Sequence, residues 1–243
     1  MRKQHGPIVK LLLFFLRIFV RKPKIINYNK SFEKKAIFIA NHSAISGPLF
    51  LALYFPSFMV PWGTFEMTGN FKKRWRYLYH HIYRDVIGYG KFLSFVMSTF
   101  FATIAKMLYK GAQLIPTYPD MRFLTTLRTS EEFLNNDIPI LIFPEDFEDG
   151  FKVFLEKYLH GFVGLSTYYF QQTGIDLPIY PIYFHKKKRV ISIGKPEYVQ
   201  GLVNQGFSRI EIASRFKDIT NQLYLEVEDG SYKKRFETQE STD

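Results

Sequence analysis

The chain contains no cysteine, which excludes disulfides, thiolate metal sites and a cysteine nucleophile. It also has no uncharged apolar run of about 20 residues, the length that a membrane-spanning helix needs. Charged residues make up only 23% of the 243 residues and hydrophobic residues 47%, so extensive disorder is excluded. The length and composition predict one folded domain with a substantial core.

Several sequence motifs of catalytic and nucleotide-binding sites are missing as well. There is no phosphate-binding Gly-x-x-x-x-Gly-Lys-Ser/Thr, no dinucleotide Gly-x-Gly-x-x-Gly, no Gly-x-Ser-x-Gly and no His-Glu-x-x-His. His80 and His81 are adjacent, so on a helix they point in different directions and make a poor metal site. We therefore expect neither a bound metal nor a resident cofactor.

Basic charge is concentrated in the first half of the chain. Residues 1–35 contain ten Lys and Arg against one acid, a net charge of +9, whereas residues 120–243 have a net charge of −4. A basic chain with 18% aromatic residues binds either nucleic acid or an anionic membrane surface. None of the Arg and aromatic patterns of nucleic-acid modules occurs, so we expect no nucleic-acid partner.

The N-terminal segment favours the membrane. Residues 8–20 are Leu- and Phe-rich, and Lys10 and Arg17 lie seven residues apart, on one face of a helix. This pattern predicts a helix that lies in the plane of an anionic membrane surface, within a basic leader spanning residues 1–30. The alternative is an ordinary buried first helix. The membrane interpretation predicts a peripheral protein on the cytoplasmic face of a membrane.

Short apolar runs alternate with longer amphipathic segments through the rest of the chain. This alternation predicts an α/β fold, a mostly parallel central sheet flanked by helices, over residues 31–227. Residues 228–243 are expected to form a polar tail. The expected strands are 36–40, 112–116, 138–143, 178–184 and 190–193, and the expected helices are 48–55, 71–86, 92–109, 121–135, 152–173 and 207–227.

Reactive side chains follow two of the expected strands. Asn41 and His42 come directly after the first strand, and Glu145 and Asp146 come after the third. Active sites of parallel α/β sheets lie beyond the carboxyl ends of the strands. A neutral histidine at such a place can accept a proton from a hydroxyl. The alternative is a histidine that only caps the turn.

Four short motifs occur in a recognisable order. They are Asn41-His42 before a helix, Leu114-Ile115-Pro116, Phe143-Pro144-Glu145, and the run from Pro178 to Ile182. In order and spacing, over roughly residues 30–200, this sequence resembles the glycerolipid acyltransferases typified by lysophosphatidic acid acyltransferases. The resemblance implies that His42 is the general base that deprotonates an acceptor hydroxyl, which then attacks an acyl thioester. It implies acyl-CoA or acyl carrier protein as the donor substrate, and a lipid acceptor.

The chain departs from the family pattern at positions that carry the chemistry. The family motif His-x4-Asp uses its Asp to orient the imidazole, but here that position is Gly47. The Arg residues expected in the second and third motifs are missing, and Asp146 and Glu148 stand where the third motif has Gly and Arg. Because clustered carboxylates repel phosphate, a phosphomonoester acceptor is disfavoured.

Two functional hypotheses follow. In the first, the chain is a membrane-associated acyltransferase with His42 as base, with Asn41, Glu145 and Asp146 in the substrate site and one of these carboxylates replacing the missing Asp. In the second, it is a catalytically impaired acyltransferase-fold protein that binds a lipid or a partner. Loss of the carboxylate in a catalytic triad lowers the rate by about 10⁴-fold when nothing replaces it.

Overall fold

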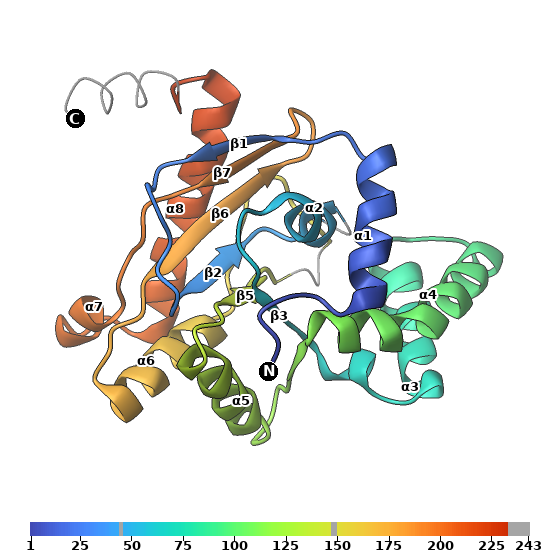
Figure 1. The fold of residues 1–243 in the computed structure, drawn as a ribbon, viewed down its shortest axis with the longest axis horizontal. Helices are drawn as coiled ribbons and strands as arrows, with labels where there is room; N and C mark the ends of the chain where they lie inside the picture. The colour runs from blue at the N-terminus through green and yellow to red at the C-terminus, as the bar shows by residue number, and fades with distance from the viewer. Residues whose placement is uncertain (44–45, 147–149, 233–243) are drawn as a thin grey trace.

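The protein is described here from a computed structural model that covers residues 1–43, 46–146 and 150–232. Within this part of the chain, seven strands form one sheet in the order β1-β7-β6-β2-β5-β3-β4 (Figure 1). All neighbouring strands are parallel except β6 and β7, which form an antiparallel hairpin. The predicted α/β fold with a mostly parallel sheet is therefore confirmed. The strands are β1 (Lys24–Asn27), β2 (Ile37–Ala40), β3 (Val60–Thr64), β4 (Ile115–Thr117), β5 (Ile140–Ile142), β6 (Ile179–His185) and β7 (Val190–Ile193).

Helices cover both faces of the sheet. On one face, Ile37 and Ile39 of β2 belong to the large core that includes residues of helices α5, α6 and α8. On the other face, Phe38 and Ala40 pack with helix α2. This alternation explains why the short strand β2 is completely buried. The helices of these two layers are α2 (Ser46–Tyr54), α5 (Phe123–Asn135), α6 (Gly161–Thr173), α7 (Gln200–Asn204) and α8 (Arg209–Asp229).

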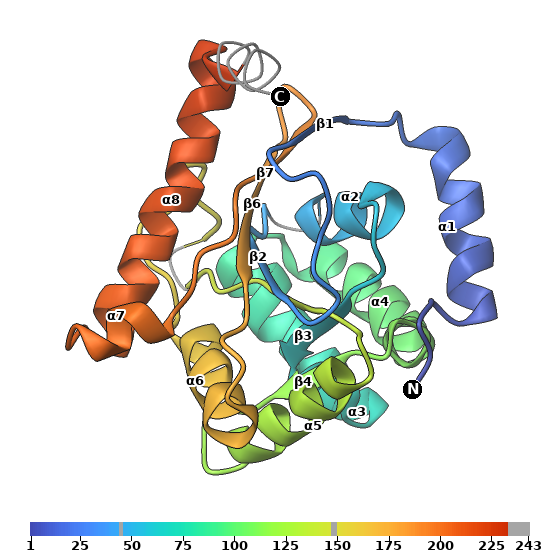
Figure 2. The ribbon, with the colours of Figure 1, turned by 60° about the vertical axis from the view of Figure 1, so that its left-hand side comes forward.

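A second group of helices projects from the α2 side of the sheet (Figure 2). It comprises α1 (Pro7–Phe19), the 3₁₀ turn η1 (Phe65–Thr68), α3 (Phe71–Arg76), the π-helix η2 (Tyr77–Val86) and α4 (Lys91–Ala112). Helix α1 packs on the C-terminal end of α2, where the Arg17 Nε donates to the Leu53 carbonyl at 2.9 Å. It also meets α4, where the Gly6 N–H donates to the Gly111 carbonyl at 2.8 Å.

Glycine allows α1 and α4 to approach closely. A Cβ on Gly111 would lie only 2.3 Å from Cγ2 of Val9, so no other residue fits there without moving the helices apart. Helix α4 is 22 residues long, longer than the expected 92–109, and is long and apolar enough to cross a membrane by length and composition alone. Its inner face of Ser and Ala packs against α3 and η2, but only 22% of its apolar 18-residue window is buried.

Two sequence-based assignments are wrong, and two strands were missed. The expected helix 152–173 begins only at Gly161, because the preceding segment is extended: the Asn221 side chain bonds both backbone groups of Leu155, at 2.8 and 2.9 Å. The expected strand 112–116 starts at Ile115, since α4 continues to Ala112. Strands β1 and β3 were not anticipated.

The boundaries drawn from sequence also differ from the element boundaries. Strand β1 falls inside the expected leader of residues 1–30, yet it pairs in register with β7 at the sheet edge. Helix α8 continues to Asp229, two residues into the expected polar tail. Residues 233–243 of that tail lie outside the described residues.

Candidate functional site

The ends of β2 and β5 bring His42 and Glu145 together. These strands are parallel neighbours, with Ile39 opposite Ile142, and His42 and Glu145 each lie three positions after this aligned pair. The backbone N–H of His42 faces the Glu145 carboxyl group. The structure thus places the two sequence-predicted groups at one point of the sheet edge where active sites of this fold class form.

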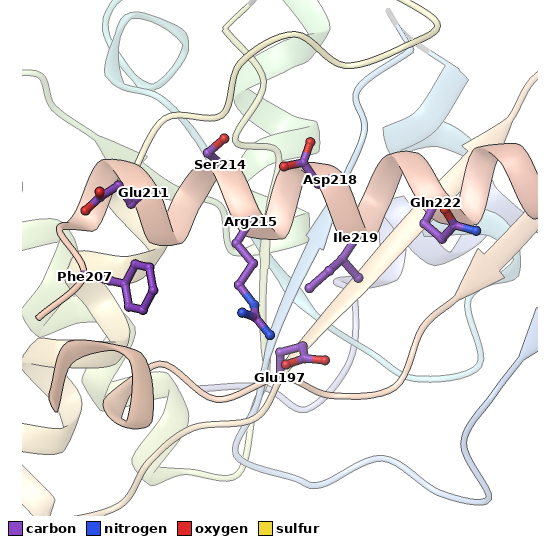
Figure 3. A pocket seen from close by; sticks show the side chains of 8 residues that line it. All are labelled: Glu197, Phe207, Glu211, Ser214, Arg215, Asp218, Ile219 and Gln222. Atoms are coloured by element: carbon purple, nitrogen blue, oxygen red, sulfur yellow. The ribbon is translucent and has the colours of Figure 1, made fainter. Parts of the chain in front are cut away.

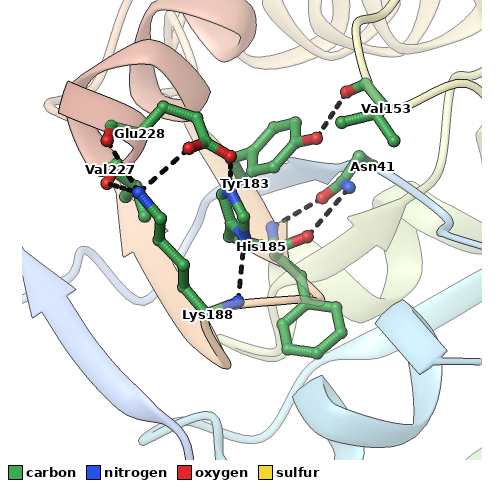
Figure 4. Close-up of polar contacts among 8 residues, drawn as sticks. Asn41, Val153, Tyr183, His185, Lys188, Val227 and Glu228 are labelled. Atoms are coloured by element: carbon green, nitrogen blue, oxygen red, sulfur yellow. Dashed lines mark hydrogen bonds and ion pairs between the residues drawn. The ribbon is translucent and has the colours of Figure 1, made fainter.

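Asn41 fixes the end of β2 to the neighbouring strand β6. Its side-chain oxygen accepts from the Phe184 N–H at 2.6 Å, and its amide nitrogen donates to the Phe184 carbonyl at 3.2 Å (Figure 4). The residue is only 2% exposed. Asn41 therefore holds the backbone from which His42 projects, and a substrate contact through its side chain remains a prediction.

The His42 imidazole lies against two phenylalanine rings. The Phe151 ring stacks on it with centroids 5.0 Å apart and an interplanar angle of 23°, and the Phe143 ring meets it edge-on at 5.1 Å. Aromatic contacts of this geometry restrict the orientation of a ring. Sequence reasoning missed the contact of Phe151 with His42, because nine positions separate Phe151 from the end of β5.

Glu145 is a buried carboxyl group. It is 5% exposed, and neither oxygen has a hydrogen-bond partner among the described residues. Burial raises its pKa to about 7, and the nearby backbone N–H of His42 offsets a part of the rise. Glu145 therefore exchanges its proton near neutral pH, as a general acid or base does.

This raised pKa predicts a pH-dependent stability. Between about pH 4.5 and pH 7 the folded protein holds a proton on Glu145 that the unfolded chain has released, so the free energy of unfolding falls as pH rises. Glu145→Gln removes this effect. As pH rises through that range, we expect the free energy of unfolding of the variant to increase by up to about 3 kcal/mol relative to that of the wild type. Urea unfolding at a series of pH values measures the difference.

The exposed Glu156 provides a matched control. Glu156→Gln should change stability by the same small amount at every pH in the series. A constant difference between the wild type and Glu145→Gln from pH 4.5 to pH 7.5 would contradict the assignment of the buried carboxyl.

Asp146 lies beside Glu145 at the mouth of a small cavity. Its carboxylate pairs with Lys157 at 2.7 Å, and its backbone N–H donates to the Lys157 carbonyl at 3.4 Å. The cavity has a volume of about 310 Å³ and contains Glu145 in its lining. The other three residues of interest in the third motif, Phe147, Glu148 and Asp149, lie outside the described residues, as do Ala44 and Ile45 of the first.

No side chain fits at Gly47 unless neighbouring backbone atoms move. A Cβ at this position would lie 2.5 Å from the His42 carbonyl oxygen and 2.7 Å from that of Asn41. The Gly47 N–H donates to the same His42 carbonyl at 3.1 Å, which draws the start of α2 against the loop. The backbone carbonyls of Asn41 and His42 thus occupy the space that the side chain of an orienting Asp would need.

A second histidine cluster joins the β6–β7 hairpin to the end of α8 (Figure 4). The His185 Nε2 lies 2.7 Å from the Glu228 carboxylate, while its Nδ1 accepts from the Lys188 N–H at 3.2 Å. Lys188 and His185 together lower the pKa of Glu228. Since His185 is only 3% exposed, this cluster is a structural clamp. No local sequence motif predicts this cluster, because Glu228 lies 43 residues from His185.

An open groove runs along α8 on the outer surface. Its volume is about 620 Å³, and Figure 3 shows the Arg215 side chain pointing toward Glu197 among acidic neighbours that include Glu211 and Asp218. It holds none of the sequence-predicted site residues.

Among the described residues, no group of three or more His, Asp and Glu side chains is arranged to hold a metal ion.

Comparison with known proteins supports the fold. No family model matches the sequence, and no curated protein sequence matches it. The structure is similar to the crystal structure of the 1-acyl-sn-glycerophosphate (LPA) acyltransferase PlsC from Thermotoga maritima, with a TM-score of 0.52 and 12% sequence identity. The match covers 91% of this chain and 80% of that one. The chain therefore has an acyltransferase-like fold.

Proposed function

We propose that the chain is a membrane-associated lipid acyltransferase that transfers an acyl chain from a thioester to a hydroxyl of a glycerolipid-type acceptor. The observation that carries the proposal is the juxtaposition of His42 and Glu145 at adjacent strand ends of an acyltransferase-like sheet. A histidine in this position suits general-base chemistry. Acyl-CoA and acyl carrier protein are the two donors to test, and no resident cofactor is needed.

The reaction needs a neutral imidazole. One ring nitrogen of His42 takes the proton of the acceptor hydroxyl as its oxygen attacks the thioester carbonyl. The tetrahedral intermediate then expels the thiolate, which recovers the proton from the imidazolium. Stacking of Phe151 on the ring keeps the imidazole in one plane through both proton transfers.

Exposed apolar side chains support the membrane part of the proposal. Phe19 of α1 is 83% exposed and Phe92 of α4 is 81% exposed, and both helices carry further exposed Phe and Leu residues. Patches of this kind mark interaction or membrane surfaces. Exposed Lys10, Lys91 and Lys106 on the same helices would attract anionic lipid on the cytoplasmic face.

Helix α2 connects this apolar surface with His42. Its first turn packs on the His42 loop, and its last turn contacts α1. Nine helical residues span only about 14 Å. A lipid acceptor whose acyl chains stay near the α1 surface would therefore present its headgroup to His42 without leaving the membrane.

The double variant Phe15→Glu/Phe19→Glu tests the membrane surface. Burying one Phe contributes about 1.5–3 kcal/mol, so we expect at least a tenfold loss of partitioning onto anionic vesicles. Vesicle flotation measures the bound fraction. Phe207→Glu replaces an exposed Phe beside the α8 groove and should bind like the wild type. Equal flotation of all three proteins would rule out α1 as the contact surface.

Acyl transfer itself is tested with purified protein on vesicles. Radiolabelled acyl-CoA and acyl carrier protein are offered with a panel of lysolipids and neutral glycerolipids, and labelled product lipid is quantified. Product formation that depends on His42 supports the proposal. If no donor and acceptor pair gives labelled product on vesicles saturated with the protein, the proposed acyl transfer is rejected.

Gly47 favours a second candidate, an acyltransferase-fold protein that binds lipid without turnover. The close contact of Gly47 with the His42 and Asn41 carbonyls leaves no room for the orienting Asp. This candidate gains support if the chain binds vesicles and headgroup probes but forms no product in the same assay.

A further inference from the structure

The cavity beside Glu145 is partly open to the surface, with Glu145 and Leu155 buried in its lining and the lysines exposed. It encloses about 310 Å³, near the lower limit for ligand pockets and suited to a small headgroup. Its walls come from the end of β5 and from the extended segment before α6, which Asn221 and the Pro144 carbonyl hold in place through Leu155 and Leu159. Its lining residues are Glu145, Asp146, Gly150, Lys152, Leu155, Glu156 and Lys157.

Glu145 gives this cavity an unmet hydrogen-bonding requirement. Both carboxyl oxygens are buried and have no hydrogen-bond partner among the described residues. Buried polar groups in folded proteins are satisfied by protein, water or ligand, and a carboxylate accepts but does not donate. Above its pKa, the Glu145 carboxylate therefore needs a donor, which water, a ligand hydroxyl or an ammonium group can supply.

The charges around the cavity discriminate against phosphate. Among the described residues of the lining, three are acidic and two are lysines, and Lys157 is already paired with Asp146 at 2.7 Å. The part of the lining that the structure describes contains no arginine, the residue that best matches phosphate geometry. A phosphomonoester carries a charge near −2 at neutral pH and would meet an uncompensated carboxylate at Glu145.

We infer that this cavity binds the acceptor headgroup through a hydroxyl or ammonium donor to Glu145, and that it excludes phosphomonoesters. The inference rests on the proposed function, because a group held in the cavity is an acyl acceptor only if the adjacent His42 acts on it. It assigns a substrate class with a neutral or cationic headgroup, unlike the 1-acyl-sn-glycerophosphate named for the structural neighbour.

Binding of soluble headgroup probes tests the inference without any acyl donor. The full chain, ¹⁵N-labelled, is titrated at pH 8 with ethanolamine, glycerol and sn-glycerol 3-phosphate, and amide shifts around Glu145 and Leu155 are followed. We expect ethanolamine and glycerol to bind, and glycerol 3-phosphate to bind at least tenfold more weakly. Glu145→Gln should weaken ethanolamine binding about tenfold, the usual loss for a hydrogen bond to a charged group.

Glu132→Gln changes an exposed carboxylate on α5 outside the cavity and should leave ethanolamine affinity within twofold. The amide spectrum of each variant establishes that it folds. Tighter binding of glycerol 3-phosphate, equal effects of the two Glu substitutions, or no binding of any probe would overturn the inference. Probe binding without acyl transfer would leave the inference standing while rejecting catalysis.

Discussion

Replacing His42 with alanine is expected to lower the rate of acyl transfer by about 10³–10⁴-fold, because the acceptor hydroxyl loses its base. Vesicle binding should be unchanged, since α1 and α4 contact other parts of the molecule. The measurement is initial-rate formation of labelled lipid at matched vesicle-bound protein. The residual rate reflects binding and orientation of the two substrates alone.

A matched histidine control separates the loss of a base from general damage. His80 is exposed on η2 and lines neither the His42 site nor the cavity, so His80→Ala should keep the wild-type rate. If His42→Ala and the wild type turned over equally, His42 would be no base, and the histidine would only cap the turn after β2.

Introducing aspartate at Gly47 is expected to destabilise the protein by about 3 kcal/mol instead of restoring an acid to the site. The new Cβ would lie 2.5 Å from one carbonyl oxygen and 2.7 Å from another, and backbone atoms cannot move aside as a side-chain end can. The carboxylate would also face these two acceptors without a donor. Urea unfolding measures the loss, and Gly47→Ala isolates the steric part.

Gly201→Ala is the control for this substitution. Gly201 lies in α7 with no atom within 4 Å of its ideal Cβ, so the change should be neutral or slightly stabilising. A Gly47→Asp protein with wild-type stability and increased acyl transfer would show that the start of α2 can open, and that the site is a weakened version of the family motif.

The central strands were predictable because burial on both faces gives short unbroken apolar runs. The strands β2, β5 and β6 are of this kind, and each was located within two residues. Strand β3 was missed because Pro61 and Gly63 are typical of loops, and only pairing with β4 and β5 makes the segment extended. Strand β1 is too short and too basic to stand out in the leader.

The candidate site was also only partly predictable from the sequence. Positions after strand ends identified His42 and Glu145, since parallel strands align their carboxyl ends. The stacking of Phe151, the closed space at Gly47 and the unpartnered carboxyl in its cavity depend on tertiary packing. No local pattern encodes them. The 152–160 segment shows why: its apolar spacing is helical, but Asn221, more than 60 residues away, bonds its backbone instead.

The pairing of β1 with β7 has a consequence for biosynthesis. Lys24 lies opposite Val190, so the strand that follows α1 has no partner until almost 170 more residues have been made. At ordinary rates of translation this interval is roughly 10–30 s. Throughout it, the Leu- and Phe-rich α1 is joined to a strand that has not yet met its partner in the sheet. We expect α1 to reach the lipid surface during synthesis, so that the sheet closes on a chain that is already bound there.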